Sequence, residues 1–299
     1  MTAVRRLTQL ALSLQMLLVV TGTAVRVTGS GLGCPTWPRC TGTSLTNTAE
    51  LGSHGYIEFG NRLLAVVMEL VGIALVLAVR RVPHPRSWTR LALVQAAVVP
   101  LQAVIGGLLV LSGLNPYVLI VHFLTSFPLV FAAAALLRRL QEPASQAAPL
   151  VRILAGGQVL ATSVVLALGT LVTGTGPHAG DPKVERLPFN PRDITQLHAD
   201  GVFLLTGLIL ATVAACWNTV HRRLSLALLG IVLAQAGVGY WQYFTGSPAA
   251  LVGVHVTLAT VAFTTASWLF LLTGRPSAGP QPHTAVPTPE HARGTATAR

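Results

Sequence analysis

The sequence predicts an all-α polytopic membrane protein, with eight transmembrane helices arranged as two tandem four-helix bundles related by an internal repeat. Of its 299 residues, 52% are hydrophobic and only 10% are charged, and the mean hydropathy is +0.63. The apolar residues form long continuous runs, which is typical of membrane-spanning helices. Motifs of the first half of the chain also recur in the second half in the same order.

Eight apolar runs have about the 20-residue length that an α-helix needs to cross a bilayer. The first run follows MTAVRR and resembles a signal peptide, but it is as long as a span and seven more runs follow it, so we interpret it as an uncleaved helix. The predicted spans are residues 7–27, 56–78, 91–111, 117–137, 153–172, 194–217, 224–244 and 251–272.

Arginines fall in short clusters at alternate ends of these spans, and all the clusters lie on one side if the chain crosses the membrane eight times. The positive-inside rule makes that side cytoplasmic, so we expect a multi-pass protein of the cell (plasma) membrane with both termini in the cytoplasm. The net charge of +11 does not indicate a nucleic-acid partner, because the arginines form no stripe with interleaved aromatic residues. The clustered residues are Arg5, Arg6, Arg80, Arg81, Arg86, Arg90, Arg138, Arg139, Arg152, Arg222, Arg223 and Arg275.

The repeat divides the chain. VTGSG at 27–31 recurs as VTGTG at 172–176, and Gln102 and His122 recur as Gln235 and His255, both at an offset of 133 residues. Each half holds an even number of spans, so the two halves point the same way across the membrane. We expect an N-terminal bundle over 1–139, a C-terminal bundle over 140–273, and a disordered cytoplasmic tail over 274–299 that is rich in Pro, Ala, Thr and Gly.

Polar residues interrupt the even-numbered spans near their outer ends, roughly 6–10 Å below the surface. Ionisable groups inside a span are costly and by default mark a functional site. Alternatives remain for each residue taken alone: Glu58 and Arg62 lie four residues apart and would also suit an interfacial anchor pair, and a buried histidine is often a hydrogen-bonded structural residue. The set consists of Glu58, Asn61, Arg62, His122, His198, Asp200 and His255.

His198 and His255 lie on the second and fourth helices of the predicted C-terminal bundle. Helical bundles hold haem between facing side chains, and haem iron takes two opposed imidazoles, so we expect a haem in this half. Zinc fits less well, because the sequence has no cluster of three or four ligands at a recognisable spacing. Haem propionates also need cations near the membrane surface, and those on the outer side are Arg26, Arg62, Lys183, Arg186 and Arg192.

Two of the three cysteines share the first outer loop. Cys34 and Cys40, in GLGCPTWPRC, would face an oxidising environment that favours a disulfide, although two unrelated thiols remain the alternative. Cys216, near the inner end of the sixth span, has no obvious partner, and we expect it to pack as a small apolar side chain.

Several of these motifs together resemble the haem A synthase family. They are RVTGSGLGCPTWPRC from Arg26, IEFGNR at 57–62, QAVIGGLLVLSGL from Gln102, and the histidines of spans four, six and eight, so the resemblance covers residues 5–272. It implies an oxidoreductase that converts the C8 methyl group of haem O to the formyl group of haem A by successive hydroxylations, for terminal oxidase assembly. It also implies haem O delivery by a haem O synthase, and an external electron donor.

The resemblance also implies roles for individual residues. His198 and His255 would be the axial ligands of a haem b cofactor, His122 would bind the iron of the substrate haem, and Glu58 would be catalytic. Arg26, Asn61 and Arg62 would lie near the substrate haem, with both haem sites toward the outer face.

The chain departs from the family at Asn61, where the commonest motif has histidine. We expect this departure to leave the substrate iron with a single imidazole from His122. The alternative is that His54, predicted in a loop before the span, replaces the missing ligand, but its side chain would have to reach inward by about 10 Å.

Two further classes of protein remain compatible with these residues. One is a membrane b-type cytochrome that carries electrons and converts neither haem. The other is a transporter built from repeats, whose polar residues line a path and which holds no stoichiometric haem.

Overall fold

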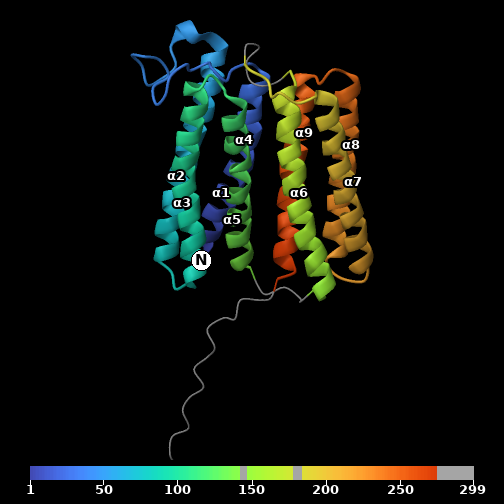
Figure 1. Cartoon of the computed structure of the whole chain (residues 1–299). Helices are drawn as coiled ribbons and strands as arrows, with labels where there is room; N and C mark the ends of the chain where they lie inside the picture. Colours follow the sequence, from blue (N-terminus) through green and yellow to red (C-terminus); the bar gives the residue numbers. More distant parts are fainter. Residues whose placement is uncertain (142–146, 178–183, 275–299) are drawn as a thin grey trace, which may run out of the picture.

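The computed structural model describes residues 1–141, 147–177 and 184–274. Within these ranges the protein is all-helical, and eight helices are long and apolar enough to cross a membrane (Figure 1). The predicted all-α class with eight membrane-spanning helices is therefore confirmed. Lys183 and the tail beyond Gly274 lie outside the described residues.

Most observed helices extend beyond the predicted spans, because a helix continues past the apolar run that identifies it. The sixth span is the exception at one end, since it was predicted to 217 and α7 ends at Ala215. Cys216, which follows the seventh helix, is free and buried, as predicted. The elements are α1 (Thr2–Val27), the 3-10 helix η1 (Ala49–Leu51), α2 (Gly52–Arg80), α3 (Arg86–Leu111), α4 (Pro116–Leu124), α5 (Ser126–Arg139), α6 (Pro149–Thr175), α7 (Pro191–Ala215), α8 (Arg222–Phe244) and α9 (Ala249–Leu272).

The fourth span was predicted as one helix over 117–137 but consists of α4 and α5, which meet at Thr125. Pro128 explains the break, because it lacks an N–H and its ring clashes with the carbonyl of Leu124, four residues earlier. The Thr125 hydroxyl donates a hydrogen bond to Gln102 Oε1 on α3 at 2.9 Å. The break is thereby tied to the neighbouring helix, three residues after His122.

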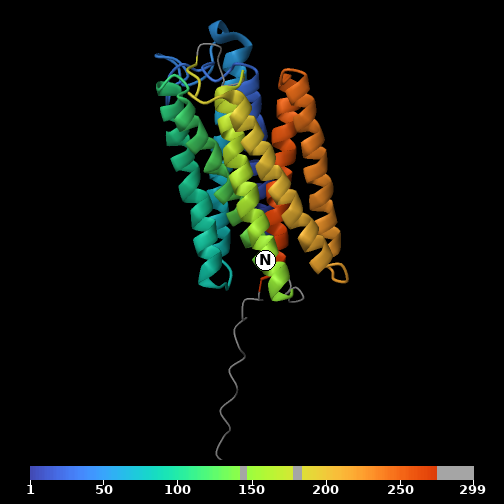
Figure 2. The same ribbon diagram turned by 45° about the vertical axis from the view of Figure 1, so that its right-hand side comes forward.

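The helices pack in two groups that meet at the centre of the molecule (Figures 1 and 2). Helices α1, α2, α3 and α4–α5 contact one another, as do α6, α7, α8 and α9, while α1 and α5 both contact α9. Phe127 on α5 and Phe263 on α9 stack edge to face at this junction, with ring centroids 5.0 Å apart. The assignment of the two groups to separate repeated domains stays a prediction.

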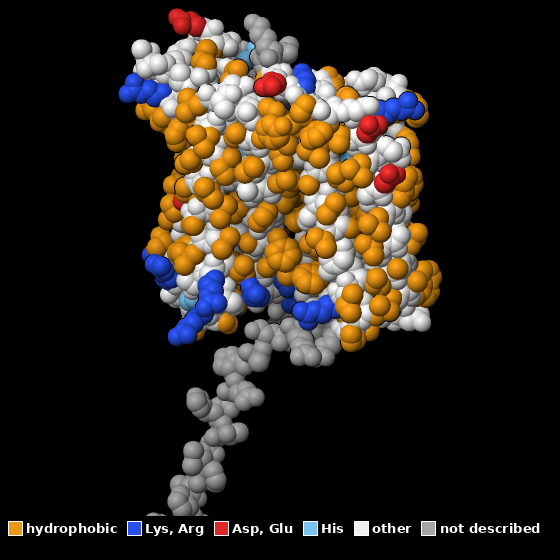
Figure 3. Space-filling model, in the orientation of Figure 1, with side chains coloured by type: hydrophobic (Ala, Val, Ile, Leu, Met, Phe, Trp, Pro, Cys, Tyr) orange, Lys and Arg blue, Asp and Glu red, His pale blue; other side chains and the backbone are white. Residues whose placement is uncertain are grey.

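The surface has the charge pattern of a membrane protein. In Figure 3 hydrophobic side chains cover the middle of the visible face, and most of its Lys and Arg side chains gather at the end where the N-terminus lies. Arg80, Arg138 and Arg139 belong to this end, in the last turns of α2 and α5. The loop between α1 and α2, which carries Cys34 and Cys40, lies at the opposite end (Figure 1).

Candidate functional site

His198 on α7 and His255 on α9 face each other across the second group of helices. Their ring centroids are 6.3 Å apart, and the ring planes are inclined by 55°. His198 Nδ1 lies 3.1 Å from the carbonyl oxygen of Val165 on α6. Because a carbonyl oxygen can only accept, Nδ1 carries the proton and Nε2 keeps a lone pair that is free for a metal.

The spacing of these two rings fits a metal ion between them. Metal–imidazole bonds in zinc sites are about 2.0–2.1 Å long, so two such bonds on opposite sides of one ion would separate the ring centres by roughly 6 Å. The observed separation is 6.3 Å. His255 Nδ1 is also buried without a hydrogen-bond partner among the described residues, a costly state for a polar atom that has no further role.

His255 is held by two residues of α8. Gln235 Nε2 donates to the carbonyl oxygen of His255 at 2.9 Å. Gly239 faces the ring, and a Cβ atom built on it would lie only 3.3 Å from His255 Cε1. The ring therefore occupies space that a larger side chain at position 239 would take.

The same arrangement recurs at His122 on α4. Gln102 Nε2 on α3 donates to the carbonyl oxygen of His122 at 3.1 Å, and a Cβ atom on Gly106 would lie 3.1 Å from His122 Cε1. His122 Nδ1 is buried, again with no hydrogen-bond partner in the part of the chain that the structure describes. Each half of the molecule thus contains a histidine that is fixed through its backbone and packed against a glycine.

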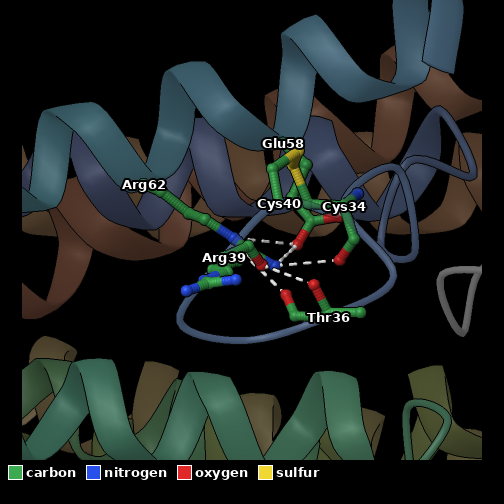
Figure 4. Close-up of polar contacts among 6 residues, drawn as sticks. All are labelled: Cys34, Thr36, Arg39, Cys40, Glu58 and Arg62. Carbon is green, nitrogen blue, oxygen red and sulfur yellow. Dashed lines mark hydrogen bonds and ion pairs between the residues drawn. A yellow bond between two sulfur atoms is a disulfide. The ribbon is translucent and has the colours of Figure 1, made fainter. Parts of the chain in front are cut away.

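Glu58 and Arg62 on α2 form the expected ion pair, with 2.5 Å between Glu58 Oε1 and Arg62 Nη2. Glu58 is only 5% exposed, and its Oε2 accepts a hydrogen bond from the backbone N–H of Cys34 at 2.7 Å. Arg62 donates to the carbonyl oxygens of Cys34 at 2.9 Å, Thr36 at 3.0 Å and Arg39 at 3.3 Å (Figure 4). The pair therefore anchors the loop between α1 and α2 to α2 itself.

This loop also covers the end of α3. Cys34 and Cys40 are fully buried, their sulfur atoms are in contact, and their Cα atoms are 4.4 Å apart. Between them in the sequence, Trp37 packs so closely on Gly107 that a Cβ atom there would overlap the indole ring. Since Gly107 directly follows the glycine that faces His122, the loop and this histidine meet on neighbouring residues of one helix.

Asn61 and His54 occupy separate environments. Asn61 is half-buried, and its Oδ1 accepts a hydrogen bond from Thr21 Oγ1 on α1 at 2.7 Å. The prediction that His54 lies in a loop before the span is wrong, because α2 already begins at Gly52. His54 is exposed in the first turn of α2, and its Nδ1 lies 2.9 Å from Ser30 Oγ. Hydropathy could not reveal this, because the first turn of α2 extends beyond the apolar run.

The comparison with known proteins identifies the family. The model of the COX15-CtaA family, described as cytochrome oxidase assembly protein, matches residues 5–180. The chain belongs to this family.

Members named Heme A synthase align with most of the chain. The protein of Shouchella clausii (strain KSM-K16) is 28% identical over 292 residues, which is 87% of this chain and 93% of the relative. The protein of Geobacillus kaustophilus (strain HTA426) is 28% identical over 315 residues, which is 96% of this chain and 95% of the relative. The predicted membership of the haem A synthase family is confirmed.

In this COX15-CtaA family member, the cations predicted to meet haem propionates have different surroundings. Arg62 is bound to the Cys34–Cys40 loop, and Arg192 is exposed at the start of α7. Arg26 and Arg186 instead have buried guanidinium nitrogens without partners within the described ranges. Among the predicted cations that the structure describes, Arg26 and Arg186 are therefore the two with unused hydrogen-bond donors.

Two residues of this family member were missed by sequence reasoning. The contact of Trp37 with Gly107 on α3 was not predicted, and the paired glycines of QAVIGGLLVLSGL are the signal that could have revealed a close approach there. Glu69 lies in the middle of α2, and its Oε2 is buried without a hydrogen-bond partner among the described residues. An acid inside an apolar run is a signal that the sequence already offered.

Proposed function

We propose that the chain is a haem A synthase, which oxidises the C8 methyl group of haem O to a formyl group by successive hydroxylations. The observation that carries this proposal is the 6.3 Å separation of the His198 and His255 rings, which suits one iron between two imidazoles. A second histidine, His122, lies in the other half with an equivalent glycine and glutamine. Together with relatives named Heme A synthase, this supports one cofactor site and one substrate site.

The two halves have separate roles in this proposal. His198 and His255 would hold a b-type haem, which would supply redox chemistry linking an external electron donor to the substrate site. His122 binds the iron of haem O and fixes the position of the substrate ring. The pairing of equivalent contacts, Gln102 to His122 and Gln235 to His255, supports two repeated bundles over residues 1–139 and 140–273.

Glu58 is the proposed proton-transfer group. Each hydroxylation of the methyl group involves proton transfer, and a carboxylate close to the substrate can take or give a proton. Glu58 is buried and fixed by Cys34 and Arg62, so its position is set before the substrate binds. Trp37, packed on Gly107 beside the residue that faces His122, would help to keep water out of the same region.

The orientation in the membrane follows from charge. The arginine-rich helix ends lie opposite the Cys34–Cys40 loop, so we assign both termini to the cytoplasm and the haem sites to the outer face of the plasma membrane. On that face an oxidising environment would join Cys34 and Cys40 in a disulfide, for which their buried sulfur contact is suited.

Haem extraction from the purified protein tests the proposed function. The full chain is purified, its absorbance spectrum is recorded, and it is then incubated in air with haem O and a reducing system before the haems are separated by chromatography. We expect a b-type spectrum and the appearance of a hydroxylated intermediate and haem A. An unchanged haem composition would instead identify an electron carrier, and the absence of stoichiometric haem would favour the transporter.

Asn61 allows a prediction about the substrate iron. Because Asn61 offers an amide and His54 is held at Ser30, we expect His122 to be the only imidazole on this iron. His122→Ala should then lose the substrate haem, His54→Ala should have little effect, and Asn61→His should give a six-coordinate low-spin form. Electron paramagnetic resonance of the substrate-loaded ferric protein measures all three outcomes.

The comparison between variants gives this experiment its control. His54→Ala removes a histidine from α2, the helix that also carries Asn61, without changing the predicted ligand set. A second bis-imidazole low-spin signal in the wild type that disappears in His54→Ala would show that His54 is a ligand after all.

A further inference from the structure

Two arginines near the outer face have guanidinium groups that the described residues leave partly unpaired. Arg26 is in the last turn of α1, and its Nε and Nη2 atoms are buried without partners in the described ranges. Arg186 precedes α7; its Nη2 donates to the carbonyl oxygen of Pro177 at 3.3 Å, while its Nη1 is buried and likewise unpaired there. The two side chains are close enough for their positive charges to repel each other.

Such a pair is costly without an anion. A guanidinium stays charged in proteins and presents five N–H donors, so burial with unused donors and a like charge nearby is unfavourable. A carboxylate can accept two parallel hydrogen bonds from one guanidinium and neutralise charge at the same time. The arrangement of Arg26 and Arg186 therefore calls for an anionic ligand.

The segment that carries Arg186 is fixed over the junction between the two groups of helices. Val184 is buried in a cluster with Leu114, which follows α3 in the first half. Leu187 packs against Gly174 at the end of α6, and its N–H donates to the Gly174 carbonyl oxygen at 3.0 Å. Arg186 thus belongs to the second half of the sequence but lies on a segment that is packed against the first half.

We propose that Arg26 and Arg186 together form a carboxylate site that binds a propionate of a bound haem. The identity of the ligand rests on the proposed function, whereas the unpaired donors do not. Arg62 is already bound to three carbonyl oxygens of the Cys34–Cys40 loop, and Arg192 is exposed, so neither competes for this role.

Two haems offer the same chemistry. One source is a propionate of the substrate haem, whose proposed site lies in the first half. Arg26 is at the end of α1 in that half, and Val184 packs the segment of Arg186 against it. A propionate of the haem between His198 and His255 is the other. Both are carboxylates at the edge of a flat apolar ring, so the experiment has to distinguish them by which haem is lost.

The test compares haem O with its dimethyl ester, in which both carboxylates are neutral. The purified full chain is titrated with each ligand, and binding is followed by absorbance. Because a charge-assisted contact needs a charged carboxylate, we expect the wild type to bind haem O, the free acid, at least about tenfold more tightly than its ester. In Arg26→Gln and Arg186→Gln this preference should shrink, with little change in affinity for the ester. Arg192→Gln, which removes an exposed arginine from the same face, should keep the full preference.

The low-spin absorbance of the cofactor distinguishes the two sources. If the arginine variants lose this signal but keep the acid-over-ester preference for the substrate, the site serves the haem of His198 and His255. If the wild type binds acid and ester equally and both variants retain the low-spin signal, the proposed site is wrong. The ester comparison in the wild type does not depend on whether a variant folds.

The outcome is independent of catalysis, because binding is measured and not conversion. A chain that prefers the acid through Arg26 and Arg186 but never forms haem A would support the carboxylate site and contradict the synthase. Conversion of haem O without any preference for the acid would support the synthase and contradict the carboxylate site.

Discussion

Replacing His198 or His255 with alanine is expected to abolish both the low-spin b-type haem signal and the formation of haem A. The two rings are spaced for one iron, and haem iron held by opposed imidazoles loses its low-spin state when either ligand is removed. The measurement is the reduced-minus-oxidised absorbance spectrum of each purified variant, together with haem chromatography after incubation with haem O.

A matched histidine controls for the substitution itself. His84, between α2 and α3, hydrogen-bonds the Val82 carbonyl oxygen and the Thr89 hydroxyl at the end of the molecule away from the Cys34–Cys40 loop. His84→Ala should therefore keep a normal spectrum. Comparable membrane insertion of all variants shows that the loss is local, and retention of the wild-type low-spin spectrum in His198→Ala or His255→Ala removes that residue from the ligand set.

The second large effect is expected for Glu58→Gln, which should bind substrate haem but lose haem A formation by roughly 10²–10⁴-fold. Glutamine has nearly the same shape and can still accept the Cys34 N–H through its amide oxygen. It cannot take or give a proton during the successive hydroxylations, so catalysis should suffer more than binding. Single-turnover conversion of bound haem O, followed by extraction, separates the two quantities.

Arg62→Gln distinguishes a role in catalysis from a role in anchoring the loop. This change removes the ion pair and weakens the contacts to Cys34, Thr36 and Arg39, but it leaves the carboxylate of Glu58 in place. We expect faster hydrogen exchange in the loop with a smaller loss of conversion than in Glu58→Gln. Equal losses in both variants, or wild-type yields of haem A from Glu58→Gln, would reduce Glu58 to an anchor.

The sequence by itself determined the membrane architecture. The length and composition of each apolar run identified the eight spans, because transfer of a helix into a bilayer depends mainly on its own residues. The same local information placed Glu58 and Arg62 on one face of α2, where the structure has their ion pair. The 133-residue offset paired Gln102 and His122 with Gln235 and His255, and each glutamine does donate to the histidine carbonyl.

The tertiary structure alone decided what the polar residues contact. Neither the attachment of the Cys34 backbone to Glu58, nor the packing of Trp37 on Gly107, nor the charge repulsion between Arg186 and Arg26 follows from local periodicity. These contacts join loops to distant helices, so they depend on how the chain closes and packs after the helices have formed. The sequence therefore supplied the spans and the candidate ligands. Loop packing determined that Arg62 is hydrogen-bonded to loop carbonyl oxygens, and that Arg26 and Arg186 keep free donors in the described part of the chain.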